Sequence, residues 1–303
     1  MTPVTWAMLV LLSLCWGASF FFIGVAVKEL PTFTIVVARV GLASLVLWIV
    51  VLATGATVPQ TRTYWRAVTF MGLANCVLPF VLIVWGQSHV PSSLAAIFIA
   101  TTPLFGIVIA HVMTADEPLT LPNVAGVLFG FAGVVVLIGP GMLHGIGTNL
   151  IAQLSILCGA FFYALSSVYA RRFSRDGFSP LLTATGQLTM STVMLLPFAL
   201  FLDRPWTLAA PSTAVVAAVL SNALISTAFA YLLYFRIVAK AGANNLMLVN
   251  YLVPVGAVIL GVAFLHETLG SQHFAGAALI FAGLALRDGK VLTLIRRAAG
   301  QEG

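Results

Sequence analysis

Residues 116–133 read DEPLTLPNVAGVLFGFAG, and residues 266–283 read HETLGSQHFAGAALIFAG. The two stretches align without a gap, so that Gly126 and Gly133 of the first return as Gly276 and Gly283 of the second. Near the start of each half, further small and aromatic residues recur: Ser13, Gly17, Ala18 and Phe20 match Ser155, Gly159, Ala160 and Phe162. A pattern repeated in this order indicates that the chain consists of two copies of one unit.

The composition of the chain places both copies in a membrane. Hydrophobic residues make up 61% of the sequence, charged residues only 7%, and the mean hydropathy is +1.09. A soluble domain has about a quarter of its residues charged. Each apolar segment is continuous and lacks the alternation of a membrane β-strand, so helices are expected rather than a barrel.

The length of the chain sets the number of helices. One span needs roughly 20 apolar residues, so 303 residues hold about ten. We therefore predict an all-α integral membrane protein with ten transmembrane helices, at 4–27, 32–53, 65–86, 91–113, 120–139, 149–171, 179–201, 212–236, 243–265 and 270–287.

Five spans fall in each half, which gives the domain organisation. We expect a first five-helix repeat at 1–140, a second at 148–288 and a tail at 289–303. An odd number of spans per repeat turns the second copy upside down relative to the first. Inverted repeats of this kind are typical of secondary transporters.

Lysine and arginine predict the orientation. If the N-terminus is cytoplasmic, eleven of these residues lie on the cytoplasmic side and two, Lys28 and Arg204, on the other. Both termini and the tail are therefore expected in the cytoplasm. The basic residues are scattered over separate loops and the tail, which argues against nucleic-acid binding: Arg62, Arg66, Arg171, Arg172, Arg175, Arg236, Lys240, Arg287, Lys290, Arg296 and Arg297.

The acidic residues bear on energy coupling, because ion-coupled transporters commonly keep a carboxylate deep in the membrane. All eight fall at span ends, in loops or in the tail: Glu29, Asp116, Glu117, Asp176, Asp203, Glu267, Asp288 and Glu302. A carboxylate proton relay at the midplane is therefore not expected. This distribution favours a facilitator or an exchanger over a pump.

Motifs of enzymes and metal sites are missing. His266-Glu267 opens like a metalloprotease helix, but Gly270 stands where the second histidine would be. The sequence contains no G-x-S-x-G elbow and no phosphate-binding loop. The three cysteines lie inside spans without metal-ligand spacing. We expect no enzymatic activity, no metal, no cofactor and no obligate protein partner, only membrane lipid and a small-molecule substrate.

Polar and aromatic side chains at membrane depth are the candidates for a solute path, because they usually face the interior of a bundle. Asn75 and Asn222 occupy matching places in the third and eighth spans. For both, two roles are equally compatible with the sequence: lining a cavity, or forming a hydrogen bond that only holds two helices together. The expected substrate-binding group is Trp16, Asn75, Phe162, Tyr163, Ser166, Asn222, Tyr231 and Asn250. Spans one, three, four, six, eight and nine should enclose the cavity, and the glycines of spans five and ten should form close packing faces.

Two further features concern movement and charge. Pro103 and Pro254 each remove a backbone hydrogen bond inside a helix, so a matched pair of hinges for alternating access is expected. Arg39 is the only charge well inside a span. Three roles are open for it: snorkelling outward, capping carbonyl groups of a neighbouring helix, or meeting a carboxylate of the solute.

Taken together, these features resemble the drug/metabolite transporter superfamily, in particular its EamA-type ten-helix exporters. In the first copy the resemblance rests on Trp16-Gly17-Ala18, Arg39, Pro103, Asp116-Glu117-Pro118-Leu119, Gly126 and Gly133. In the second copy it rests on Gly159-Ala160, Pro254, Glu267-Thr268-Leu269, Gly276 and Gly283. The second copy departs from the first at Gln187, near the position that matches Arg39, and at Cys158, which matches Trp16.

The resemblance implies export of small metabolites from the inner membrane of a bacterium, through a cavity that the two halves share. Within the family the chain is similar to aromatic amino-acid exporters of the YddG type, so amino acids, aromatic ones included, are the expected substrates. Export of drugs, nucleosides or other metabolites is the alternative, and a channel is another.

Overall fold

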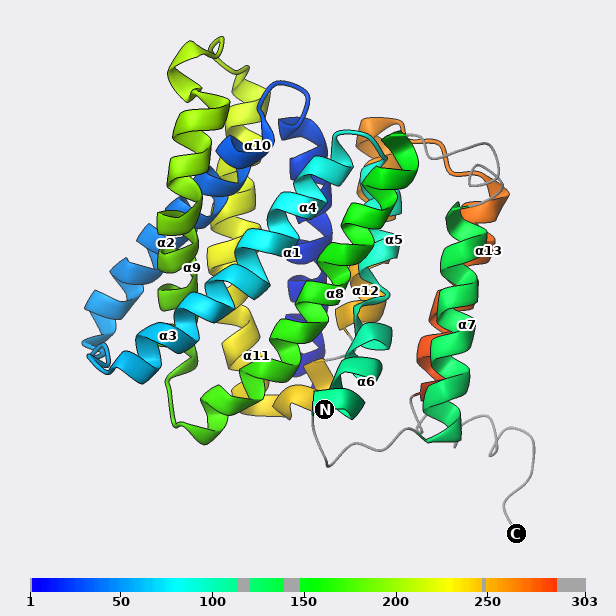
Figure 1. Cartoon of the computed structure of the whole chain (residues 1–303), viewed down its shortest axis with the longest axis horizontal. Helices are drawn as coiled ribbons and strands as arrows, with labels where there is room; N and C mark the ends of the chain where they lie inside the picture. Colours follow the sequence, from blue (N-terminus) through cyan, green and yellow to red (C-terminus); the bar gives the residue numbers. More distant parts are fainter. Residues whose placement is uncertain (1, 114–119, 139–147, 247–248, 288–303) are drawn as a thin grey trace.

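The computed structural model describes residues 2–113, 120–138, 148–246 and 249–287, and within these ranges the chain contains helices and no strand. Figure 1 shows the helices as one bundle. In chain order they are α1 (Pro3–Ala26), α2 (Thr32–Thr54), α3 (Arg62–Met71), η1 (Gly72–Val77), α4 (Leu78–Gln87), α5 (Ser92–Ile99), α6 (Thr102–Met113), α7 (Leu121–Ile138), α8 (Thr148–Arg175), α9 (Pro180–Phe198), η3 (Ala199–Asp203), η4 (Pro205–Thr207), α10 (Thr213–Ala223), η5 (Leu224–Phe229), α11 (Ala230–Leu246), α12 (Val249–Leu265) and α13 (Ser271–Arg287).

The predicted helical membrane architecture is confirmed. Eight helical segments of the described chain are long and apolar enough to cross a membrane, and two shorter apolar helices, Val249–Leu265 and Ser271–Leu286, complete the ten passes. Large apolar side chains such as Ile49, Leu128 and Phe201 are exposed on the outside of the bundle. Such a surface is suited to contact with lipid chains rather than water. The expected tail, 289–303, and the acidic residues Asp116 and Glu117 lie outside the described residues.

The predicted boundary between the eighth and ninth spans is wrong. We expected one helix to end at 236 and the next to begin at 243, but α11 continues to Leu246 and α12 begins at Val249. The segment 236–246 contains three alanines, one arginine, one lysine and one leucine, which are good helix formers, and the single Gly242 costs only about 1 kcal/mol. Asn244 and Asn245 therefore belong to α11 and not to the ninth pass.

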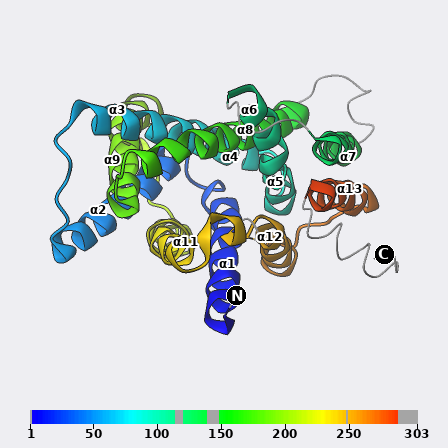
Figure 2. The ribbon, with the colours of Figure 1, turned by 90° about the horizontal axis from the view of Figure 1, so that it is seen from below.

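The glycines of α7 and α13 form close packing faces, as predicted, and the structure shows that the two faces pack against each other (Figure 2). A Cβ atom added to Gly133 would lie 2.7 Å from the carbonyl oxygen of Gly276, and one added to Gly283 would lie 2.4 Å from that of Gly126. The lower-numbered glycine of each helix thus meets the higher-numbered glycine of the other, so the helices are antiparallel. In the repeat Gly126 matches Gly276 and Gly133 matches Gly283. The contact of Gly133 with Gly276 is therefore equivalent to the contact of Gly283 with Gly126, as expected for two inverted copies.

This contact predicts the first substitution effect. In Gly276→Leu, the new side chain would collide with the backbone of Gly133 and with Leu137, whose Cβ lies 2.9 Å from the added Cβ position. Overpacking of this kind typically costs about 1–3 kcal/mol. We expect a lower thermal midpoint of the purified protein in detergent, measured by loss of the monodisperse chromatographic peak on heating.

Gly106→Ala is the matched control. Gly106 also lies inside a membrane helix, α6, but a Cβ added there meets nothing within 4 Å. Because alanine is the better helix former, this variant should be as stable as the parent or slightly more stable. Equal loss of stability in both variants would contradict close packing of α7 on α13.

Three of the four described carboxylates gather at one end of the bundle, the upper end in Figure 1, which we call the carboxylate end. Glu29 accepts hydrogen bonds from Ser212, Asp203 accepts from the backbone and hydroxyl of Thr34, and Glu267 accepts from the backbone N–H groups of Ser92 and Ser93 at 2.6 and 2.9 Å. Each carboxylate therefore satisfies N–H groups at the start of a helix, where a negative charge is favourable.

Candidate solute-binding site

A cavity of about 430 Å³ lies in the centre of the bundle. Its volume falls within the range of about 300–1,000 Å³ usual for small-molecule sites. Every expected span contributes to its wall, and the second and seventh spans, which we had not expected, contribute as well. Helices α7 and α13 supply none of the lining residues, in agreement with their role as a packed pair; the wall comes from α1, α2, α3, η1, α4, α5, α6, α8, α9, η5, α11 and α12.

The structure brings six of the eight predicted site residues to this cavity: Trp16, Asn75, Tyr163, Ser166, Tyr231 and Asn250. Phe162 and Asn222 are not among the lining residues. Asn222 is buried, and its side-chain oxygen accepts a hydrogen bond of 2.9 Å from Ser19 Oγ. Phe162 stacks edge-on with Phe161, at a centroid distance of 5.6 Å. Solute binding by the lining residues stays a prediction.

Both asparagines lie at an interruption of their helix. Asn75 is part of the π-helical segment η1, and Asn222 lies two residues before the π-helical segment η5, in the last turn of α10. A hydroxyl group compensates the irregular backbone in each place: Ser191 Oγ donates to the Gly72 carbonyl at 3.1 Å, and Thr227 Oγ1 donates to the Asn222 carbonyl at 2.9 Å. Segments of this kind occur frequently at functional sites.

Asn75 is the centre of a hydrogen-bond network in the cavity wall. Its Nδ2 donates to Gln187 Oε1 at 3.3 Å and to the Tyr231 hydroxyl at 3.2 Å, while its Oδ1 accepts from Ser166 Oγ at 2.9 Å. Gln187 Nε2 also donates to the Tyr231 hydroxyl, at 2.9 Å. Four helical elements, η1, α8, α9 and α11, therefore meet through neutral groups that can also bind a polar solute.

Aromatic rings form much of the remaining wall. The rings of Trp16 and Tyr234 lie 6.1 Å apart between centroids, and those of Tyr231 and Phe235 lie 6.0 Å apart in a stacked arrangement. All four side chains line the cavity. Such rings offer apolar faces on which a planar or apolar solute can stack.

Arg39 reaches the cavity from α2 instead of snorkelling toward the end of its helix. Its guanidinium carbon lies 3.9 Å from the ring centroid of Phe80, and its Nε donates to Thr227 Oγ1 at 2.9 Å. Only 7% of the residue is exposed. The snorkelling alternative is therefore excluded, because both contacts lie within the bundle.

The two prolines behave differently. At Pro103 the helix is interrupted between α5 and α6, and Thr102 Oγ1 donates to the Ile99 carbonyl, which has lost its usual N–H partner, at 2.7 Å. Around Pro254 the helix α12 is continuous, and Pro254 itself lines the cavity. Hinge function of the pair stays a prediction.

The cavity is closed toward the carboxylate end. There its wall is made of buried apolar residues, including Ile23 and Ile83, and Gln87 Nε2 donates across the bundle to the Phe20 carbonyl at 3.0 Å. At the other end, which we call the open end, the lining residues Ser167 and Pro180 are exposed.

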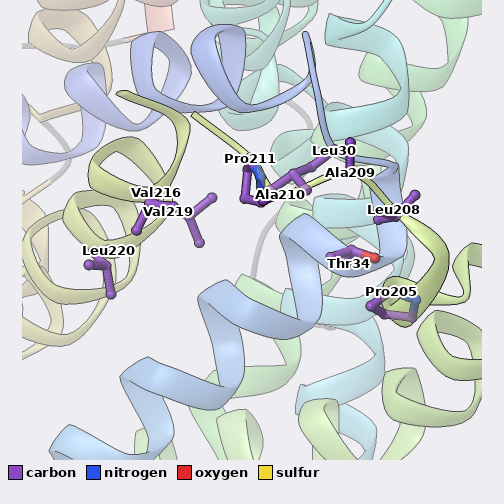
Figure 3. Close-up of a pocket in the computed structure, with 10 residues that line it drawn as sticks. All are labelled: Leu30, Thr34, Pro205, Leu208, Ala209, Ala210, Pro211, Val216, Val219 and Leu220. Carbon is purple, nitrogen blue, oxygen red and sulfur yellow. The ribbon is translucent and has the colours of Figure 1, made fainter. Parts of the chain in front are cut away.

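A second hollow lies at the carboxylate end, between the start of α2 and the segment that leads into α10 (Figure 3). Thr34 is its single hydroxyl-bearing lining residue, and Asp203 already accepts a hydrogen bond from that hydroxyl. The other lining groups are apolar, so this hollow offers little chemistry for a polar solute.

Comparison with known proteins gives consistent matches. The model of the EamA-like transporter family matches residues 4–139 and again residues 150–287. A solved crystal structure has the same fold, with a TM-score of 0.68 at 20% identity over 97% of this chain and 99% of that chain.

Three relatives span nearly the whole chain. A transporter of Archaeoglobus fulgidus is 27% identical and covers 96% of this chain and 99% of its own length. The inner membrane transporter YedA of Escherichia coli is 28% identical, with 93% and 90% covered. A protein of Streptantibioticus cattleyicolor described as a "Probable terminal-alkyne amino-acid exporter" is 26% identical, with 99% and 98% covered.

Proposed function

The chain belongs to the EamA-like transporter family, and from this premise we propose that it exports amino acids, aromatic ones included, by alternating access across the inner membrane of a bacterium. In this proposal both termini are cytoplasmic, as the distribution of lysine and arginine predicts. The open end of the cavity then faces the cytoplasm, ready to load solute for export. The halves 1–140 and 148–288 act as the two moving units.

The chemistry of the cavity carries this proposal. Its wall combines aromatic rings, neutral amides and hydroxyls with one arginine. Rings can hold an apolar or aromatic side chain, while amides and hydroxyls bind the polar end of the same solute. The relative described as an amino-acid exporter supports the same substrate class.

The described carboxylates support transport without a deep proton relay. Glu29, Asp203 and Glu267 bind helix N-termini at the carboxylate end, and Asp176 directly follows the end of α8. None of these four described carboxylates lines the cavity. Hydrogen bonds from Ser212 hold the pKa of the exposed Glu29 carboxyl below its ordinary value of 4.5. This contact is therefore intact at neutral pH, and it is lost only when the pH falls below that value and protonates the carboxylate.

The test is transport in proteoliposomes with labelled phenylalanine, tryptophan, leucine and alanine, each with and without a pH gradient. We expect saturable flux that requires no gradient. Flux of a nucleoside or a cationic drug without flux of any amino acid would overturn the substrate class. Flux that rises linearly with solute concentration would favour a channel over a carrier.

Glu267 gives a prediction about the closed end. Its carboxylate joins the segment after α12 to the first turn of α5 through Ser92 and Ser93. In Glu267→Gln the charge is lost, and the amide cannot accept all of these hydrogen bonds, so that closure weakens. Cysteine placed at Ile83 should then be labelled severalfold faster by a membrane-impermeant thiol reagent applied from the carboxylate end.

Glu29→Gln is the control for this change, because it removes an equivalent charge from a helix N-terminus where both partners are exposed. Exposed charge interactions are weak, so its effect on labelling should be small. If Glu267→Gln labels at the parental rate, the Glu267 contact does not hold the cavity closed.

A further inference from the structure

We propose that Arg39 binds a carboxylate of the transported solute, so that the substrates of this protein are monoanions or zwitterions with a free carboxylate. The proposal deepens the proposed function and rests on it for the direction and the mechanism of transport. The binding chemistry itself stands on the surroundings of Arg39.

The guanidinium group is held in place but remains largely unpaired. It has five N–H donors. The Nε donor is bonded to Thr227, and the Phe80 ring covers the guanidinium carbon. No other described residue accepts a hydrogen bond from Arg39. Two contacts therefore orient the group and leave its Nη atoms for a further partner.

The Nη atoms are accessible from the cavity. Among the described residues, three side-chain polar atoms are sealed from solvent without a hydrogen-bond partner: Gln87 Oε1, Gln153 Oε1 and Ser226 Oγ. The guanidinium nitrogens of Arg39 are not sealed in this way, although the residue as a whole is only 7% exposed. Because Arg39 lines the cavity, a solute carboxylate inside it can approach these unpaired donors.

No described carboxylate compensates the charge. The titratable groups that interact electrostatically with Arg39 are Tyr163, Cys76 and Tyr231, and phenol and thiol groups carry no charge at neutral pH. Glu29, Asp203 and Glu267 are engaged at the carboxylate end, and Asp176, which directly follows α8, does not line the cavity. A charged residue inside a membrane protein normally has a partner or faces a polar path. A solute carboxylate would supply that partner through two parallel N–H···O bonds.

The asymmetry of the two repeats limits the charge of the solute. In the second copy Gln187 occupies the position near that of Arg39, and it also lines the cavity. Among the described lining residues Arg39 is therefore the one cation, and the second repeat supplies the neutral amide of Gln187 in its place. One fixed charge matches one carboxylate, whereas a phosphate dianion would remain half compensated in a site of low dielectric.

Pairs of ligands in which a carboxylate is replaced by a neutral amide of nearly the same shape test the proposal. Purified protein in lipid nanodiscs is titrated with L-phenylalanine and L-phenylalaninamide, and with 3-phenylpropionate and 3-phenylpropionamide, and binding is followed by tryptophan fluorescence. Since hydrogen bonds to charged groups are strong, the carboxylate should bind on the order of ten- to a hundredfold tighter than the amide in at least one pair. In Arg39→Gln, which copies the second repeat, this ratio should fall to about one.

The outcomes separate the two proposals. Equal affinity within both pairs for the parent protein would overturn the role of Arg39, whether or not amino acids are transported, and this measurement needs no variant to fold. A preference for carboxylate that survives Arg39→Gln would overturn it as well. Arg39→Lys keeps the charge but loses the planar fork, and should retain part of the preference. A preference lost in Arg39→Gln, combined with no flux of any amino acid, would support the carboxylate site and refute the amino-acid substrate class.

Discussion

Asn75→Leu is expected to reduce amino-acid flux at least tenfold. Leucine has a similar volume but has neither the donor Nδ2 nor the acceptor Oδ1 of asparagine. The three partners Gln187, Tyr231 and Ser166 therefore each lose a hydrogen bond. A buried polar group without a partner costs about 1–3 kcal/mol, and the network joins four helical elements. The measurement is initial flux of labelled phenylalanine in proteoliposomes, normalised to folded protein.

Asn222→Leu is the matched comparison, because this asparagine is the repeat counterpart but is not a lining residue. Its loss leaves the buried Ser19 hydroxyl without the acceptor Oδ1. We expect less folded protein and a lower thermal midpoint, while the KM of the folded fraction stays close to the parental value. If Asn222→Leu raises KM as much as Asn75→Leu does, the distinction between the two residues is wrong.

The contrast between the two asparagines also shows where sequence reasoning stops. Their positions in the repeat are equivalent, and burial of an amide suits either role. Each lies in or beside a π-helical segment, η1 or η5, where the backbone has more residues per turn than an α-helix. A pattern read at 3.6 residues per turn therefore loses its phase across these segments, and the face that a residue presents cannot be extrapolated through them.

Helix α8 gives a second example. Phe162, Tyr163 and Ser166 of this helix were expected in the substrate-binding group. Tyr163 and Ser166 do line the cavity, together with Ser167, Ala170 and Phe173, whereas Phe162 does not. Aromatic residues occur on both sides of this helix, so their periodicity alone does not distinguish the cavity from packing or lipid. By contrast, the expected residue Tyr231 does line the cavity, and Thr227 and Tyr234, four residues before and three after it, line the cavity as well.

The helical passes themselves were predictable, because a membrane leaves few alternatives for a long apolar run. The glycine contact of α7 with α13 was predictable for a similar reason, since small residues permit close approach. The contribution of Gln187 was harder to foresee. It depends on which helices meet across the bundle, and the available signal was its place near the repeat position of Arg39.

Cysteine labelling should give an all-or-none map of the open cavity. In a background without Cys15, Cys76 and Cys158, a membrane-impermeant thiol reagent applied from the side of the open end should label cysteine at Ser167 and Thr183, both lining residues near that end. It should not label cysteine at Asn222, which is 2% exposed and bonded to Ser19. Labelling is read by a mass-tag gel shift in right-side-out and inverted vesicles.

Protection by solute then connects accessibility with transport. Phenylalanine near saturating concentration should slow the labelling of cysteine at Ser166, which lies in the Asn75 network, more than that of cysteine at Ser167, which is exposed. A solute seated between the rings and the network covers the first position and leaves the second open to water. If Ser167 and Thr183 positions resist labelling from both sides, or if phenylalanine protects no position, the cavity is not the solute path, and its polar residues serve to hold the helices together.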